Sequence, residues 1–143
     1  MGLLMSAAML LLAAAGERAA IVVAGENPPA RVTRATVLTP ADGPPVVLYA
    51  AVNQTERQID TVTVIAFVFK ADGTLKARQT APARRTLEPR ETKYSTLVLD
   101  GSPIEATDII VVGINQVQNT GSDDWWRADL QRAAEAAVPL KKP

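Results

Sequence analysis

The stretch that decides the fold is IDTVTVIAFVFK, residues 59–70. It is rich in β-branched and aromatic residues and contains no Gly or Pro, which is typical of a β-strand. Alternate residues of a strand share one face. Both faces of this strand are apolar, so we expect each to be covered, either by the same chain or by a partner. One face would carry Ile59, Ile65, Phe67 and Phe69, and the other Val62, Val64, Ala66 and Val68.

Further β-rich runs lie on both sides of this strand and are separated by turn sequences. Asp72-Gly73, directly after it, predicts a tight hairpin and an antiparallel return strand. Sustained helical periodicity is absent before residue 122, and the spacing of the runs is typical of an all-β fold. We therefore predict an immunoglobulin-like antiparallel β-sandwich of about seven strands. The other expected strands are residues 31–38, 46–52, 75–80, 92–99 and 108–118.

The Ala-rich C-terminal sequence predicts a short helix that ends before Pro139 and could cover the second face of residues 59–70. The helix could be capped by Ser122 or Asp123. Its apolar stripe would then be Trp126, Leu130, Ala133 and Ala137. Alternatively, Trp125-Trp126 lies on a last strand and the helix begins after Asp129. We favour this second arrangement.

The chain begins with an uncharged run of Leu, Met and Ala that ends at Ala15. A run of this length is shorter than the ~20 residues that a membrane-spanning helix needs, and Ala13-x-Ala15 fits a signal-peptide cleavage site. We expect residues 1–15 to be a signal peptide and the protein to be secreted or periplasmic. A buried helix or an uncleaved anchor is the alternative. Residues 16–29 would be a linker, 30–128 the sandwich and 129–143 a helical tail.

The turn sequences around the central strand form a recognisable pattern. Val52-Asn53-Gln54-Thr55 precedes the strand, Lys70-Ala71-Asp72-Gly73 follows it, and LEPRET occupies residues 87–92. This pattern resembles the FxLYD-type and related immunoglobulin-like domains of bacterial envelope proteins, which are similar in plan to the water-stress sandwiches. Such domains commonly have Gly where this chain has Arg90. The resemblance covers residues 30 to 118 and implies an interaction or accessory module without catalytic residues.

Composition excludes several classes of function. The 143 residues contain no His and no Cys, and 15 basic residues balance 15 acidic ones. Zinc sites, thiol catalysis, disulfides and His-dependent acid–base chemistry are therefore excluded, and zero net charge argues against nucleic-acid binding. No nucleotide-binding, calcium-binding or Ser-nucleophile motif is present. We expect no cofactor, no metal and no enzymatic activity.

Two groups of residues are candidates for binding. Residues 76–93 hold six basic and two acidic side chains, which could form a patch for an anionic partner or keep an exposed edge strand from aggregating. Of the tryptophans, Trp126 is assigned to the core and Trp125 to the surface, where Trp can stack on a sugar or anchor a protein. The candidate partner-binding residues are Arg78, Arg84, Arg85, Arg90 and Trp125.

These features favour an exported, non-catalytic sandwich that binds an envelope protein or an anionic glycan. One alternative is a homodimer formed through the face that carries Val62, Val64, Ala66 and Val68. A less favoured alternative is a glycan hydrolase that would depend on a pair of carboxylates such as Asp123 and Asp124.

Overall fold

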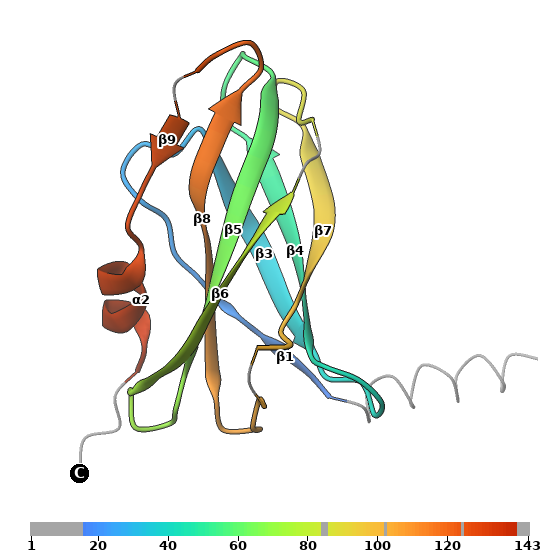
Figure 1. Ribbon diagram of the computed structural model, residues 1–143, viewed down its shortest axis with the longest axis vertical. Helices are drawn as coiled ribbons and strands as arrows, with labels where there is room; N and C mark the ends of the chain where they lie inside the picture. Colours follow the sequence, from blue (N-terminus) through green and yellow to red (C-terminus); the bar gives the residue numbers. More distant parts are fainter. Residues whose placement is uncertain (1–15, 84–85, 102, 124, 140–143) are drawn as a thin grey trace, which may run out of the picture.

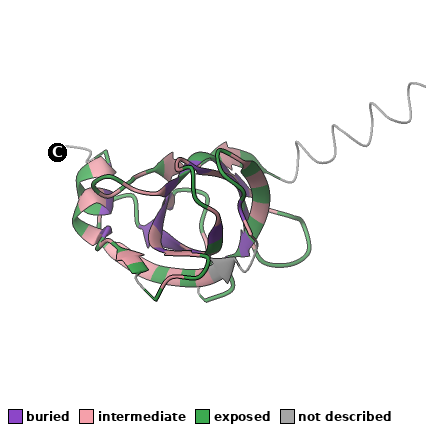
Figure 2. Ribbon diagram, turned by 90° about the horizontal axis from the view of Figure 1, so that it is seen from above, coloured by how far each residue is buried: buried purple, intermediate pink, exposed green. Residues whose placement is uncertain are grey.

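Two β-sheets pack face to face, and one short helix lies on the outside of one of them (Figures 1 and 2). This computed structural model describes residues 16–83, 86–101, 103–123 and 125–139. The predicted all-β sandwich is thereby confirmed. Its elements are β1 (Glu17–Ala19), β2 (Ile21–Val22), β3 (Ala30–Leu38), β4 (Val46–Asn53), β5 (Ile59–Phe69), β6 (Leu75–Ala83), β7 (Thr92–Val98), β8 (Ile109–Asn119), β9 (Trp125–Arg127) and α2 (Gln131–Ala137).

The strand order follows an immunoglobulin-like plan. One sheet has the order β1-β3-β4-β7 and the other β2-β8-β5-β6, with β9 paired to β8. Consecutive strands form the hairpins β3–β4, β5–β6 and β8–β9, whereas β4–β7 and β5–β8 pair strands that are distant in sequence. This arrangement is typical of an immunoglobulin-like Greek-key sandwich. The seven strands β3 to β9 lie within residues 30–128, and β1 and β2 precede them in the chain.

Residues 16–29 differ from the expected linker, because they contribute two strands. β1 pairs with β3 in the first sheet, whereas β2 runs parallel to β8 in the second. Between them, the Ala20 N–H donates to the Ala35 carbonyl, and just beyond β2 the Val23 N–H donates to Val112. The chain therefore crosses from one sheet to the other at this side of the sandwich. Within residues 16–29, the tandem Pro28 and Pro29 lie outside any strand, as the sequence predicted for a linker.

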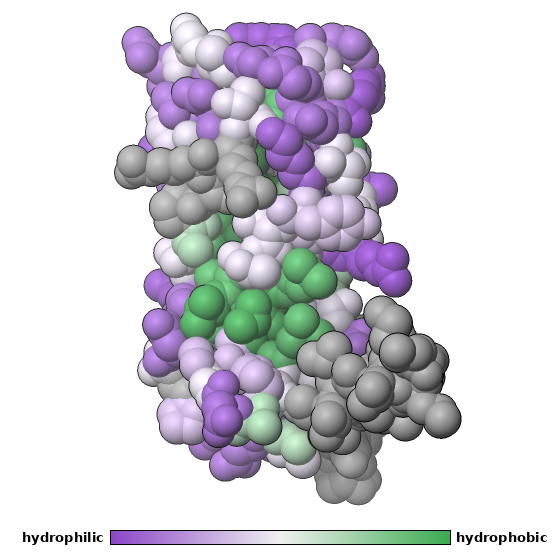
Figure 3. Space-filling view, turned by 90° about the vertical axis from the view of Figure 1, so that its right-hand side faces the viewer, coloured by the Kyte–Doolittle hydropathy of each residue, from purple (hydrophilic) through white to green (hydrophobic). Residues whose placement is uncertain are grey.

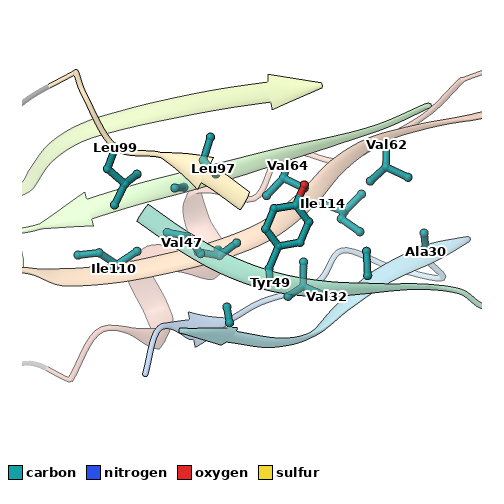
Figure 4. Close-up of a cluster of buried hydrophobic side chains, with 14 of the residues drawn as sticks. Ala30, Val32, Val47, Tyr49, Val62, Val64, Leu97, Leu99, Ile110 and Ile114 are labelled. Carbon is teal, nitrogen blue, oxygen red and sulfur yellow. The ribbon is translucent and has the colours of Figure 1, made fainter. Parts of the chain in front are cut away.

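The main core lies between the two sheets and receives one face of β5 (Figure 4). Val62, Val64, Ala66 and Val68 point into it and are at most 3% exposed. The homodimer predicted through this face is therefore wrong, because the same chain already covers it. Ile59 also belongs to this core and not to the Phe67 face. A register shift between Ile59 and Thr61 breaks the strict alternation of side chains along β5, so Ile59 points to the other face than predicted.

The opposite face of β5 is covered by the C-terminal helix, as the sequence predicted (Figure 1). Phe67 and Phe69 stack there with ring centroids 6.3 Å apart. The tryptophans lie on β9 and the helix begins later, at Gln131, whose N–H donates to the Asp129 carboxylate. The predicted stripe is wrong in detail, because the shorter helix starts too late to include Trp126. The buried residues of this segment are Leu130, Ala134 and Val138, whereas Ala133 and Ala137 are half-buried.

Candidate interaction surface

The basic candidates do not form one patch in the described structure. Arg78 lies on β6, opposite Phe67, and donates to the side chain of Gln131 on α2. Arg90 lies instead in the loop before β7 and forms an ion pair with Glu56 at 2.7 Å. Each is thus engaged within the chain on a different element. Arg84 and Arg85 lie outside the described residues, so their role in partner binding stays a prediction.

The two remaining basic residues of this segment are also engaged. Lys76 forms an ion pair with Asp108, and Lys93 lies 3.7 Å from Glu91 and donates to the Thr86 carbonyl. Residues 76–93 have a local surplus of positive charge, but two of the acidic partners, Glu56 and Asp108, lie outside this segment. Pairing across the fold neutralises part of that surplus, which no count over a window of sequence could show.

Arg90 occupies a strained backbone position. Its φ is 65°, in the left-handed region that Gly normally occupies. The Glu91 N–H donates to the Glu88 carbonyl across this turn, and Pro89 fills the position that favours its fixed φ. The backbone here therefore has the conformation that Gly would provide in the resembling domains, although the residue is Arg.

The tryptophans divide as the sequence predicted. Trp126 is half-buried, packs against the main core and donates its indole N–H to the Glu26 carbonyl. Trp125 is 37% exposed, and the Arg127 guanidinium lies 5.9 Å from its ring centroid. Trp125 is therefore a surface residue with a cationic neighbour on the same strand.

The carboxylates do not provide a catalytic arrangement among the described residues. Asp108 is buried and bound by Lys76 Nζ and the Glu105 N–H. Asp100 accepts from Gln79, and Asp123 lies in the exposed turn before β9. No three His, Cys, Asp or Glu side chains in the described part of the chain come together as a metal site. Asp124 lies outside the described residues.

Sequence reasoning missed an apolar surface on the outer face of the β1-β3-β4-β7 sheet, here called the outer strip. The strand register aligns Leu38, Val46 and Val98 in one row across β3, β4 and β7. Leu48 lies on β4 between this row and the row that contains Tyr94. Leu48 is 37% exposed and Val98 40%. Figure 3 shows the resulting apolar area in the middle of this side of the molecule.

A shallow hollow of about 320 Å³ lies on the same face. Leu38, Leu48 and Ala50 line it, together with the Tyr94 side chain, which is 59% exposed. Glu17, Arg34 and Thr36 form its polar parts. An apolar floor with an aromatic residue and charged groups around it is the chemistry of a protein-binding surface.

The sequence did carry a signal for this surface. VVLYAAV, residues 46–52, is apolar at both odd and even positions, like residues 59–70. Val47 and Tyr49 point into the main core, so the even positions must point outward. On β5, which also has two apolar faces, α2 supplies the second cover. On β4 no helix covers the second face in the described structure: Leu48 is exposed and Val46 and Val52 are half-buried, whereas the small Ala50 is buried.

The comparisons give no relative from which function could be transferred. No family model matches this chain, and no match was found among curated proteins or solved structures. Among the described residues, no helix has the length and apolar character needed to cross a bilayer. The fold and its surfaces define the class of protein: a small immunoglobulin-like β-sandwich with an apolar strip on one outer sheet face.

Proposed function

We propose that this protein is an exported, non-catalytic accessory module of the bacterial envelope that binds a protein partner through the outer strip. The observation that carries the proposal is the contrast between the two sheets. The outer face of the β2-β8-β5-β6 sheet is covered by α2, whereas Leu48, Val98 and Tyr94 on the other sheet are exposed. Exposed apolar residues that lie together on a small protein mark an interaction site.

A protein partner fits this surface better than the anionic glycan that the sequence also suggested. The outer strip is aliphatic, with one aromatic residue, and such surfaces release water when a similar apolar surface packs on them. The basic side chains that a polyanion would need are partly engaged in ion pairs. Export is supported by the apolar run that ends at Ala15, and the accessory role by the resemblance to FxLYD-type envelope domains.

The test compares three forms of the protein as bait in an envelope extract: the wild type, Leu48→Lys and Thr33→Lys. Thr33 is an exposed residue of β3 in the same sheet, so Thr33→Lys adds the same charge outside the outer strip. We expect a partner to be captured by the wild type and Thr33→Lys and lost with Leu48→Lys, at equal melting temperature. Equal capture by all three forms would exclude the outer strip as the binding surface.

Export is tested separately by the mass of the protein recovered from the periplasm or the medium. We expect it to begin near Gly16, because the small-residue site ends at Ala15. A protein recovered with residues 1–15 intact would contradict cleavage.

A further inference from the structure

The strand β7 forms one edge of its sheet and is regular along its whole length (Figure 1). Its seven residues, TKYSTLV, contain no Gly or Pro, and they pair with β4 without a register shift. The single charge in it, Lys93, is engaged with Glu91 and with the Thr86 carbonyl. A regular edge strand with few charges is a template on which another strand can pair.

The hydrogen bonds to β4 determine which groups of β7 face outward. The Asn53 N–H donates to the Glu91 carbonyl at one end, and the Leu99 N–H donates to Pro45 at the other. In an antiparallel pair the bonded residues alternate, so the odd-numbered residues of β7 bond to β4. The N–H and C=O groups of Thr92, Tyr94 and Thr96 therefore point away from β4.

Val98 supports this assignment. Its carbonyl accepts from the side chain of Gln79 on β6, and thus points to the outer edge as the alternation requires. Gln79 also covers that end of β7, so the edge that can accept a new strand runs from Thr92 to Thr96. The side chains of these residues lie on the same face as the outer strip.

The other edge strands of the described structure are protected by recognisable features. The β6 strand carries Lys76 and Arg78 and has Pro82 within its paired region. The strands β1, β2 and β9 have only two or three residues each. Charged side chains, Pro and short length all hinder edge pairing. The β7 strand has no Pro and is seven residues long, and its one charged side chain, Lys93, is engaged with Glu91 and the Thr86 carbonyl.

We infer that β7 pairs with β7 of a second copy of this chain, antiparallel, around a two-fold axis beside Tyr94. This register places Thr92 opposite Thr96 of the partner subunit, and both copies offer the same outward groups, so each donor meets an acceptor. Thr92, Tyr94 and Thr96 would each form a bonded pair. The two four-stranded sheets would then form one continuous sheet through the dimer.

Side-chain chemistry favours a second copy in this register. Tyr94 is 59% exposed and would lie beside Tyr94 of the partner subunit, and such cross-strand aromatic pairs stabilise a sheet. Lys93 would lie opposite Ser95 of the partner subunit, so no like charges are directly opposed. The dimer would also join the outer strips of both copies into one larger apolar surface. This inference does not depend on the proposed envelope partner.

The first test measures the mass of the natively purified protein by light scattering coupled to size-exclusion chromatography. We expect a dimer at micromolar concentration. Thr96→Pro removes an N–H that points away from β4, so the pairing of β7 with β4 keeps all its hydrogen bonds. Because the dimer is two-fold symmetric, the substitution removes two hydrogen bonds from the interface. It should raise the dimer dissociation constant by more than about tenfold. Thr96→Ala, which keeps the N–H, should remain dimeric. A monomeric wild type, or a Thr96→Pro form as dimeric as the wild type, would overturn the inference.

A second test does not require Pro to be tolerated. The chain contains no Cys, so Tyr94→Cys would introduce a single thiol. A bonded antiparallel pair has Cα atoms about 5.5 Å apart, within the range of a disulfide. Mild oxidation should therefore link two copies of Tyr94→Cys, while Thr33→Cys, on β3 and separated from β7 by β4, should remain unlinked. Equal linking of both variants would overturn the proposed axis. Monomeric protein with partner capture intact would reject the dimer and leave the proposed function standing.

Discussion

The Nζ atom of Lys76 lies 2.7 Å from Oδ2 of Asp108, a residue that is only 5% exposed. The same oxygen accepts the Glu105 N–H at 2.8 Å. Arg18 donates to the carbonyls of Glu105, Ala106 and Asp108 in the same loop. Through these bonds Asp108 connects the edge strand β6 to the loop before β8, and Arg18 ties that loop to β1. Polar contacts thus link both sheets at this end of the sandwich.

The Asp108 contact predicts a pH-dependent stability. Burial raises the pKa of Asp108, but the Glu105 N–H, the Lys76 hydrogen bond and charge, and the Arg18 charge outweigh it and hold the pKa below 3.8. The unfolded chain therefore takes up the proton first as the pH falls. The stabilisation that the ionised Asp108 provides is complete above pH 3.8 and is lost as the pH falls through the pKa of Asp108 in the folded protein. Urea unfolding of the wild type and Asp108→Asn should show a stability difference that narrows in this acidic range. A constant difference would contradict the assignment.

Asn53 is predicted to be essential for the stability of the fold, at the opposite end of the sandwich. It is fully buried, and its amide nitrogen donates to the Arg57, Leu87 and Glu88 carbonyls while its oxygen accepts from Thr55. Asn53→Asp would place an acceptor against three carbonyls. We expect it to lower the free energy of unfolding by more than ~3 kcal/mol, since buried unpaired polar groups cost about 1–3 kcal/mol each. Urea unfolding measures this. Gln54→Glu, at a half-buried neighbour, is the control and should have a smaller effect.

Phe67→Ala should lower the free energy of unfolding by about 3–5 kcal/mol, the usual range for emptying a buried Phe site. Phe67 is 1% exposed, and its neighbours include Phe69, Leu130 and Ala134. Because α2 provides part of this site, removal of residues 129–143 should also destabilise the protein. Circular dichroism during thermal unfolding checks both changes. A fully stable truncated form would show that the helix is dispensable as a cover.

Gly113 should not tolerate even a methyl group. A Cβ atom there would lie 2.6 Å from Leu130 Cδ1 and 2.7 Å from the Val23 carbonyl oxygen. The backbone of Val23 would have to move, and we expect Gly113→Ala to destabilise the fold by about 1–3 kcal/mol, as overpacked cores do. Gly101→Ala is the matched control, because its nearest neighbour is the flexible Gln79 side chain at 3.3 Å. Equal stability of the two variants by urea unfolding would contradict close packing at Gly113.

Local sequence patterns predicted most of the strand plan. The β5–β6 hairpin follows from Asp72-Gly73: Gly73 has φ 90°, and the Lys70 N–H donates to Thr74. The position of α2 follows from Ala-rich sequence before Pro139. The turn and the helix depend on residues that are neighbours along the chain, so both can be predicted from the sequence. Trp125 lies at the surface and Trp126 packs half-buried against the main core, as predicted, and alternation on β9 turns the two side chains to opposite faces.

What the sequence determined by itself is therefore an all-β sandwich with an apolar central strand and a helical cover. Only the tertiary structure decided where the charges and the surfaces lie. Glu56 meets Arg90, and Asp108 meets Lys76, across 34 and 32 positions of the chain. Leu38, Val46 and Val98 become one surface only through the register of three strands. A single residue shift turns a strand's side chains to the opposite face, so bulges and long-range pairing, which no local pattern encodes, decide which side chains face solvent.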